Sequence, residues 1–180
     1  MDQRPIGVFD SGLGGLTAVR EMRRLMPSEN IIYFGDTSRV PYGGRSPEIL
    51  LKYARQDVHF LRSFDIKAVL VACGTVSTTA LPQLQAENDL PILGVVEPAC
   101  RKAAAMTRNR RVGLIATAAS VRSGAYERTL HRLDETIHVV SRACPLLVPL
   151  VENGYVNDGN PVTQYTMTTL EELGLLKMDF

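Results

Sequence analysis

The sequence predicts an α/β protein of two Rossmann-like units with largely parallel sheets, the second of them incomplete. Short apolar runs alternate with longer segments whose apolar residues recur every three or four positions, which is typical of strands connected by helices. Two of the runs, residues 67–72 and 111–116, are apolar almost throughout, as in strands buried on both faces of a parallel sheet. Apolar residues make up 45% and charged residues 22% of the 180 residues, as in an ordinary globular protein.

The first unit is expected to span residues 1–97 and to carry Asp10 and Cys73. Its strands are expected at residues 5–9, 30–34, 67–72 and 91–96. The apolar residues of 16–26 have the spacing of an amphipathic helix. A second helix is expected over 46–61, because Ser46 can cap it and a proline and a glutamate follow in the first turn. A third helix is expected to begin directly after Cys73.

The second unit is expected to span residues 98–180. Helices are expected at residues 99–106, 123–133 and 162–173, and strands at 111–116 and 138–140. An α/β unit normally continues from such a last helix into another strand, whereas this sequence ends seven residues later, at Phe180. We therefore expect the second unit to be truncated.

Charge and cysteine usage exclude several classes of function. Lys and Arg total 20 and Asp and Glu total 19, so the net charge of +1 gives no basic footprint for a nucleic acid or an anionic membrane. The longest apolar run, residues 68–73, is too short to span a bilayer, and the first ten residues do not resemble a secretion signal. Three cysteines without a C-x-x-C pair predict neither a disulfide framework nor a metal site. We expect a soluble, cytoplasmic protein.

Ligands of open α/β sheets bind beyond the carboxyl ends of the strands, so the residues found there are the candidates for function. These candidates are Asp10, Ser11, Asp36, Tyr42, Gly43, Cys73, Gly74, Thr75 and Thr117. Cys73 ends a strand and precedes a predicted helix, whose free N–H groups and dipole are expected to lower the pKa of the thiol and to bind a carboxylate. A thiolate in that position suits proton abstraction α to a carboxyl group. The alternative is that Cys73 is a small core residue, which is the role expected for Cys100 and Cys144.

The glycine-rich segment after Asp10 does not match a dinucleotide-binding fingerprint. The pattern G-x-G-x-x-G would start at Gly12 and pass Gly14, but the sequence has Thr17 where the third glycine is needed. The Asp10 carboxylate would also repel a phosphate at the tip of the strand, whereas it suits an ammonium group.

Five segments resemble, in order, blocks of the glutamate racemase family: residues 9–17, 33–43, 71–75, 115–126 and 144–152. The resemblance implies cofactor-independent interconversion of L- and D-glutamate for peptidoglycan synthesis, with one thiol on each side of the substrate α-carbon. It implies that Cys73 is the first thiol, that Asp10 assists it near the substrate amine, and that Glu152 supports the second thiol. The implied substrate-binding residues are Asp10, Ser11, Tyr42, Gly43, Gly74, Thr75 and Thr117. The implied partners are glutamate and a possible second copy of the chain.

The sequence departs from the family pattern at two places. Gly74 stands where the family usually has asparagine, so a side-chain contact is lost while the backbone N–H remains. The family's second cysteine lies in a Gly-Cys-Thr-His block that follows the region of Glu152, and neither Cys100 nor Cys144 matches it. Two other functions therefore stay open: a one-thiol relative such as a malonate-type decarboxylase, and a non-catalytic glutamate-binding module. The block at Asp10 argues against the decarboxylase.

Overall fold

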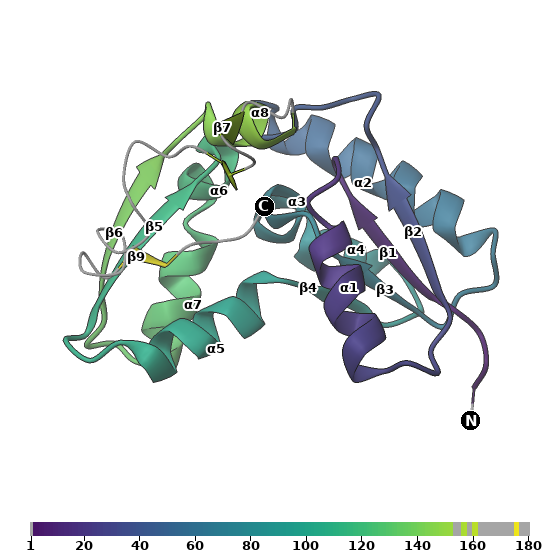
Figure 1. Cartoon of the computed structure of the whole chain (residues 1–180), viewed down its shortest axis with the longest axis horizontal. Helices are drawn as coiled ribbons and strands as arrows, with labels where there is room; N and C mark the ends of the chain where they lie inside the picture. The colour runs from purple at the N-terminus through teal and green to yellow at the C-terminus, as the bar shows by residue number, and fades with distance from the viewer. Residues whose placement is uncertain (1, 153–155, 158–159, 162–174, 177–180) are drawn as a thin grey trace.

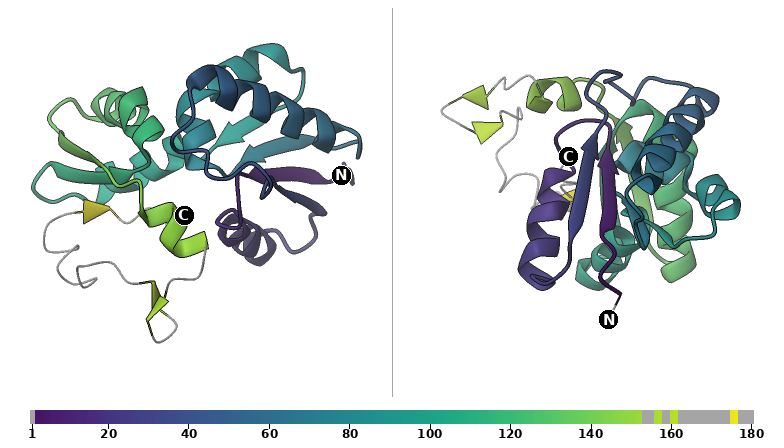
Figure 2. Two further views of the ribbon diagram at one scale, coloured as in Figure 1. Left: turned by 90° about the horizontal axis from the view of Figure 1, so that it is seen from above. Right: turned by 90° about the vertical axis from the view of Figure 1, so that its right-hand side faces the viewer.

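The computed structural model describes residues 2–152, 156–157, 160–161 and 175–176, and it contains two parallel sheets packed against helices (Figure 1). A short antiparallel pair, β7 (Val156–Asn157) and β8 (Asn160–Pro161), is the remaining strand pairing. Seen from above, the two sheets with their helices lie side by side (Figure 2). The predicted α/β class with parallel sheets is confirmed.

The first sheet has the strand order β2-β1-β3-β4, and all of its pairs are parallel. Its strands are β1 (Ile6–Asp10), β2 (Ile31–Gly35), β3 (Ala68–Val71) and β4 (Ile92–Gly94). The two central strands, β1 and β3, place the fully buried side chains of Val8, Phe9, Val69 and Val71 in the interior. The strands β1, β2 and β3 were predicted to within about one residue, because continuous apolar runs mark strands that are covered on both faces.

Four helices belong to this sheet: α1 (Leu16–Leu25), α2 (Pro47–Arg62), α3 (Gly74–Thr79) and α4 (Leu81–Glu87). The predicted start of α2 is confirmed, since the Ser46 side chain accepts a hydrogen bond from the backbone N–H of Ile49 and Pro47 is the first helical residue. The apolar stripe of α2 (Leu50, Ala54, Val58 and Leu61) is buried in the core of the first unit.

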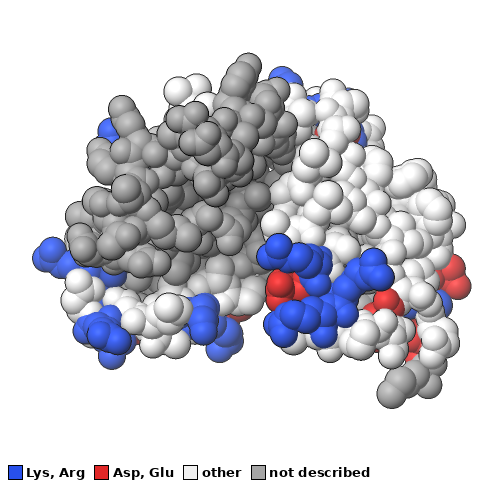
Figure 3. Space-filling view, in the orientation of Figure 1, with Lys and Arg blue, Asp and Glu red and all other residues white. Residues whose placement is uncertain are grey.

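Helix α1 differs from α2 because none of its residues is buried. Its basic residues, among them Arg23 and Arg24 in the last turn, lie on the surface, where Figure 3 shows Lys and Arg side chains gathered over this helix beside an acidic group. The apolar side chains of Leu16 and Leu25 are also largely exposed. The helix therefore owes little of its stability to packing within the described part of the chain.

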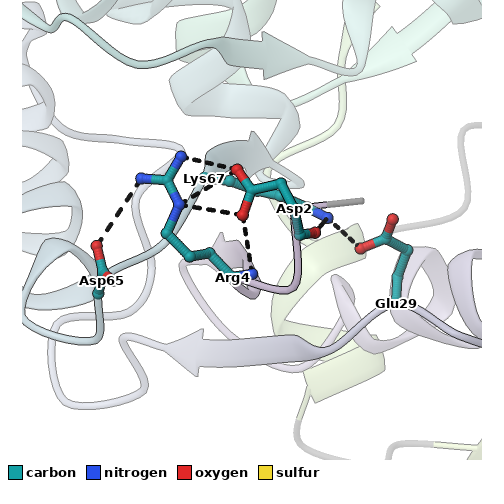
Figure 4. Close-up of polar contacts among 5 residues, drawn as sticks. All are labelled: Asp2, Arg4, Glu29, Asp65 and Lys67. Atoms are coloured by element: carbon teal, nitrogen blue, oxygen red, sulfur yellow. Dashed lines mark hydrogen bonds and ion pairs between the residues drawn. The ribbon is translucent and has the colours of Figure 1, made fainter.

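The amino-terminal entry into β1 is held by polar contacts (Figure 4). The Lys67 ammonium group donates to the backbone carbonyl of Asp2 at 2.8 Å and pairs with Glu29. The Arg4 guanidinium pairs with Asp2 and lies 3.8 Å from Asp65. Since Arg4 and Asp65 are mostly exposed, their pair contributes little stability; Lys67, which is largely covered, is the stronger anchor.

The second sheet has the order β6-β5-β9, with β5 (Arg111–Ala116), β6 (His138–Ala143) and β9 (Leu175–Leu176) parallel. Its helices are α5 (Val96–Met106), α6 (Ala118–Ser123), α7 (Ala125–Leu133) and α8 (Leu147–Glu152). A second core cluster, separate from the first, contains Val96, Cys100, Leu114, Tyr126 and Leu130. The packing role expected for Cys100 is what the structure shows.

Several predicted boundaries are wrong. The strand expected over 91–96 ends at Gly94, and Val96 already opens α5, so the division expected after residue 97 falls inside a helix whose buried face belongs to the second core. The helix expected over 123–133 begins at Ala125 as α7, because Gly124 adopts a left-handed conformation (φ +63°) that separates it from α6. Helices α4, α6 and α8 were not predicted. The helix expected over 162–173 lies outside the described residues.

Candidate active site

A cavity of about 600 Å³ lies at the carboxyl ends of β1, β3 and β5, within the size range of small-molecule sites. Its walls come from both units: α1 and α3 line it from the first, and α6, α7 and Val148 of α8 from the second. The cavity brings together eight of the predicted site residues: Asp10, Ser11, Tyr42, Gly43, Cys73, Gly74, Thr75 and Thr117. Glu152 ends α8, and its side chain lies outside what the structure describes.

The loop after β1 is organised around the carboxylate of Asp10, which is 7% exposed. One carboxylate oxygen accepts hydrogen bonds from the backbone N–H groups of Gly12, at 3.3 Å, and Gly15, at 3.0 Å. A Cβ atom at Gly15 would lie 2.7 Å from the Cβ of Asp10, so only glycine allows this close approach. The loop amides that could otherwise bind a phosphate therefore bind the protein's own carboxylate. This agrees with the conclusion from the sequence that the loop is not a dinucleotide-binding fingerprint.

Cys73 lies at the end of β3 and directly precedes α3, as predicted. Its side chain is only 4% exposed, and its thiol donates to the hydroxyl oxygen of Ser11, with 3.5 Å between the two atoms. Burial, together with the negative charge of Asp10, raises the pKa of the thiol from 9.0 to about 12, although hydrogen bonds from Ser11 and Val76 act in the opposite direction. The expectation of a lowered thiol pKa was wrong, because desolvation outweighs the favourable backbone donors.

Tyr42 and Gly43 reach the cavity on a loop that is anchored by a buried polar cluster. The Tyr42 hydroxyl donates to the carboxylate of Asp36 and lies 3.2 Å from that of Asp57. Arg39 pairs with both carboxylates, at 2.5 Å from Asp36 and 2.7 Å from Asp57. Burial and the charge of Asp36 raise the pKa of Asp57 to about 7, since one guanidinium group cannot balance two buried carboxylates.

Hydroxyl groups connect the two units at the floor of the cavity. The Oγ1 atoms of Thr75 and Thr117 lie 3.0 Å apart, and Thr78 donates to Ser120 at 3.2 Å. The backbone N–H of Ala119 donates to the carbonyl oxygen of Gly43 at 3.0 Å. The hydroxyl groups of Thr75 and Thr117 thereby present short polar side chains to the cavity, where they can bind a polar ligand.

Tyr126, Asp57 and Arg39 also belong to the site or its supports, although no function was predicted for them from the sequence. Tyr126 lines the cavity opposite Gly74, and burial raises the pKa of its hydroxyl. Asp57 could have been recognised, because it is an acidic residue within the apolar stripe of α2, between Ala54 and Val58. Tyr126 carried no comparable signal.

The described residues contain no group of three or more His, Cys, Asp or Glu side chains that could hold a metal ion. No helix in the described part of the chain is long and apolar enough to cross a membrane. Among the cysteines, Cys73 lines the cavity, Cys100 is buried in the second core and Cys144 is half-buried at the end of β6. The described chain thus brings the thiol of Cys73 and the carboxylate of Asp10 to the same cavity.

The fold and the cavity together define an α/β protein with a small-molecule site at the carboxyl ends of its strands. The sequence profile of the family described as Asp/Glu/Hydantoin racemase matches residues 17–173. The chain belongs to this family.

Two curated relatives, both named glutamate racemase, illustrate the similarity. The protein of Geobacter metallireducens is 47% identical over 169 residues, which are 94% of this chain and 62% of the relative. The protein of Chlorobium phaeobacteroides is 49% identical over 154 residues, which are 85% of this chain and 57% of the relative. The chain thus spans about three fifths of the length of these relatives.

Solved structures give the same result. Glutamate racemase isoform RacE1 from Bacillus anthracis superimposes with a TM-score of 0.82 at 42% identity, over 85% of this chain and 57% of that one. Glutamate racemase from Francisella tularensis, solved in complex with D-glutamate, superimposes with a TM-score of 0.80 at 39% identity, over 87% of this chain and 59% of that one.

Proposed function

We propose that this chain supplies the first catalytic thiol and most of the substrate cavity of a glutamate racemase, an enzyme that interconverts L- and D-glutamate without a cofactor. The observation that carries the proposal is the position of Cys73 and Asp10 in one cavity, at the ends of adjacent parallel strands. The similarity to proteins named glutamate racemase, one of them solved with D-glutamate, supports glutamate as the substrate.

Charge complementarity suggests how glutamate would be oriented. The Asp10 carboxylate attracts the substrate ammonium group, and the hydroxyl group of Thr75 can donate to a substrate carboxylate. The ammonium charge also offsets the field of Asp10, which is the second cause of the raised pKa of Cys73. Substrate binding would therefore lower the pKa of the thiol that has to react.

In the proposed reaction the sulfur of Cys73, as a thiolate, accepts the α-proton of glutamate. The electron pair of the broken C–H bond stays on the α-carbon and is delocalised into the adjacent carboxylate. A second acid then donates a proton to the opposite face of the α-carbon, which inverts its configuration. Following the family resemblance, we assign this role to a second thiol supported by Glu152; none of the three cysteines of this sequence matches that thiol.

Isotope exchange tests the proposal. The chain is incubated separately with L- and D-glutamate in D₂O, and proton NMR follows the loss of the α-hydrogen signal. Exchange into at least one enantiomer is expected from the Cys73 thiol, and exchange into both, with a decaying circular dichroism signal, is expected when both bases are present. A folded chain that binds glutamate but exchanges neither enantiomer would be a binding module instead.

The alternative of a malonate-type decarboxylase is tested by CO₂ release from a malonate-type acid, which we expect to be absent. Supply of D-glutamate for peptidoglycan in the cytoplasm follows from the proposed activity and rests on the family resemblance. A homodimer likewise remains a prediction, which the mass of the protein in solution would check.

A further inference from the structure

Tyr126 is a buried side chain whose polar end has no partner within the described structure. It lies in the first turn of α7, its residue is only 4% exposed, and its ring packs in the second core cluster. Its hydroxyl makes no hydrogen bond to any described residue, and the side chain lines the cavity. The buried side-chain atoms that lack a partner among the described residues do not include this oxygen, so the hydroxyl is open to the cavity, where a ligand can supply its hydrogen-bond partner.

The space in front of this hydroxyl is open because residue 74 is a glycine. A Cβ atom built at Gly74 would lie 3.7 Å from the Tyr126 hydroxyl oxygen and would meet no other atom within 4 Å. The backbone of Gly74 does not have a positive φ, so its conformation does not demand glycine. The missing side chain therefore leaves a passage between the hydroxyl and the part of the cavity that adjoins Cys73.

The electrostatic surroundings keep the hydroxyl protonated. Burial, and then the neighbouring thiols of Cys100 and Cys73, raise the pKa of Tyr126 above its ordinary value of 10.0. The group is therefore a hydrogen-bond donor at neutral pH, and a carboxylate is the strongest acceptor that an amino-acid substrate offers.

We propose that Tyr126 is a further substrate-binding residue, whose hydroxyl donates a hydrogen bond to the α-carboxylate of the substrate across the space left open by Gly74. The assignment to the α-carboxylate rests on the proposed function: the α-carbon must lie next to the Cys73 sulfur, and Gly74 directly follows Cys73. The α-carboxylate is bonded to that carbon, whereas the side-chain carboxylate of glutamate is three bonds away from it.

Binding of three ligands to the wild-type chain and to Tyr126→Phe tests the proposal. The ligands are glutamate, glutamine, which keeps the α-carboxylate, and isoglutamine, in which that group is an amide. We expect Tyr126→Phe to lower the affinity for glutamate and for glutamine roughly ten- to hundredfold, because a hydrogen bond to a charged group is lost. The affinity for isoglutamine should fall less than about threefold in this variant, because its α-amide is uncharged. Equal weakening of all three, or of none, would overturn the proposal.

The thermal midpoint separates this role from a structural one. Tyr126→Phe removes a hydroxyl that has no partner among the described residues, so the midpoint without ligand should stay the same or rise. Tyr53→Phe is the matched control, because it makes the same chemical change at a half-buried tyrosine outside the cavity and should leave all three affinities unchanged. A wild-type chain that binds none of the three ligands would overturn the proposed function as well, whereas normal binding with no effect of Tyr126→Phe overturns this inference alone.

A double-mutant cycle tests the part of Gly74. In Gly74→Asn an amide side chain enters the space in front of the Tyr126 hydroxyl, so removing that hydroxyl should then cost less than about threefold in glutamate affinity, well below its cost in the wild type. An equal cost of Tyr126→Phe in both backgrounds would show that Gly74 does not open the path to the substrate.

Discussion

The side-chain oxygens of Thr75 and Thr117 lie 3.0 Å apart, although 42 residues separate them in the chain. Thr75 belongs to the first helix after β3, and Thr117 caps the first helix after β5. The contact therefore joins the amino-terminal ends of corresponding helices in the two units, and the floor of the cavity forms only where the units meet. Variants that disturb this junction should affect stability and ligand binding together.

Gly43→Ala should disturb the junction directly. A Cβ atom at Gly43 would lie 2.7 Å from two carbon atoms of Thr117, and the Gly43 carbonyl oxygen accepts the hydrogen bond from Ala119. We expect the free energy of unfolding in urea to fall by about 1–3 kcal/mol, the usual cost of overpacking. The matched control is Gly44→Ala, since a Cβ atom there meets nothing within 4 Å. Equal stability of the two variants would contradict the close approach.

Cys73→Ser should abolish proton transfer without abolishing binding. A serine hydroxyl stays protonated at neutral pH, so deuterium exchange into glutamate should fall by roughly 10²- to 10⁴-fold, the usual contribution of a general base. The affinity for glutamate should change little. Cys144→Ser is the control, because Cys144 is half-buried and lies outside the cavity, and its exchange rate should equal that of the wild type. Undiminished exchange in Cys73→Ser would remove this thiol from the mechanism.

The raised pKa of Cys73 predicts how the reactivity of its thiol toward an alkylating reagent depends on pH. With a pKa of about 12, the thiolate fraction, and with it the rate of iodoacetamide labelling, should rise about tenfold per pH unit between pH 8 and 11. Asp10→Asn removes the second cause of the raised pKa, so labelling at a given pH should be faster. Peptide mass spectrometry distinguishes Cys73 from the other two cysteines. A labelling midpoint near pH 8 in the wild type would contradict the raised pKa of Cys73.

Asp57 should make stability depend on pH. Because its pKa is raised from 3.8 to about 7, the folded protein binds this proton more tightly than the unfolded chain does. Its contribution to stability is therefore full below pH 3.8 and is lost as the pH rises through about 7. Asp57→Asn can keep the contacts to Tyr42 and Arg39 without titrating, so it should lose less stability than the wild type between pH 5 and 8. Urea unfolding at both pH values measures the difference.

Most strands were predictable from the sequence, because a strand buried on both faces needs an uninterrupted apolar run. The short helices were not. Helix α4 begins at Leu81, and only Ala80 separates it from the end of α3, so the sequence does not reveal that there are two helices. The division of α6 from α7 depends on the left-handed conformation of Gly124, and glycine alone does not reveal which conformation it adopts.

Most residues that form the site could be predicted from the sequence, but the pKa of its thiol could not. Residues at the ends of parallel strands must meet at one edge of a sheet, which is why Asp10, Cys73 and Thr117 could be grouped in advance. The pKa of Cys73 could not be predicted, because it depends on how deeply the sulfur is buried. Tyr126 was missed because its position beside Gly74 results from the packing of the second unit against the first, which no local pattern encodes.

The hydrogen bonds from Gly12 and Gly15 to Asp10 also determine which small molecules bind poorly in the cavity. Sugar phosphates and other phosphorylated metabolites would meet a fixed negative charge and find the nearby amide donors already engaged. A competitive inhibitor of this site should instead place a protonated amine against that carboxylate. An anionic scaffold without such an amine would gain little from this loop.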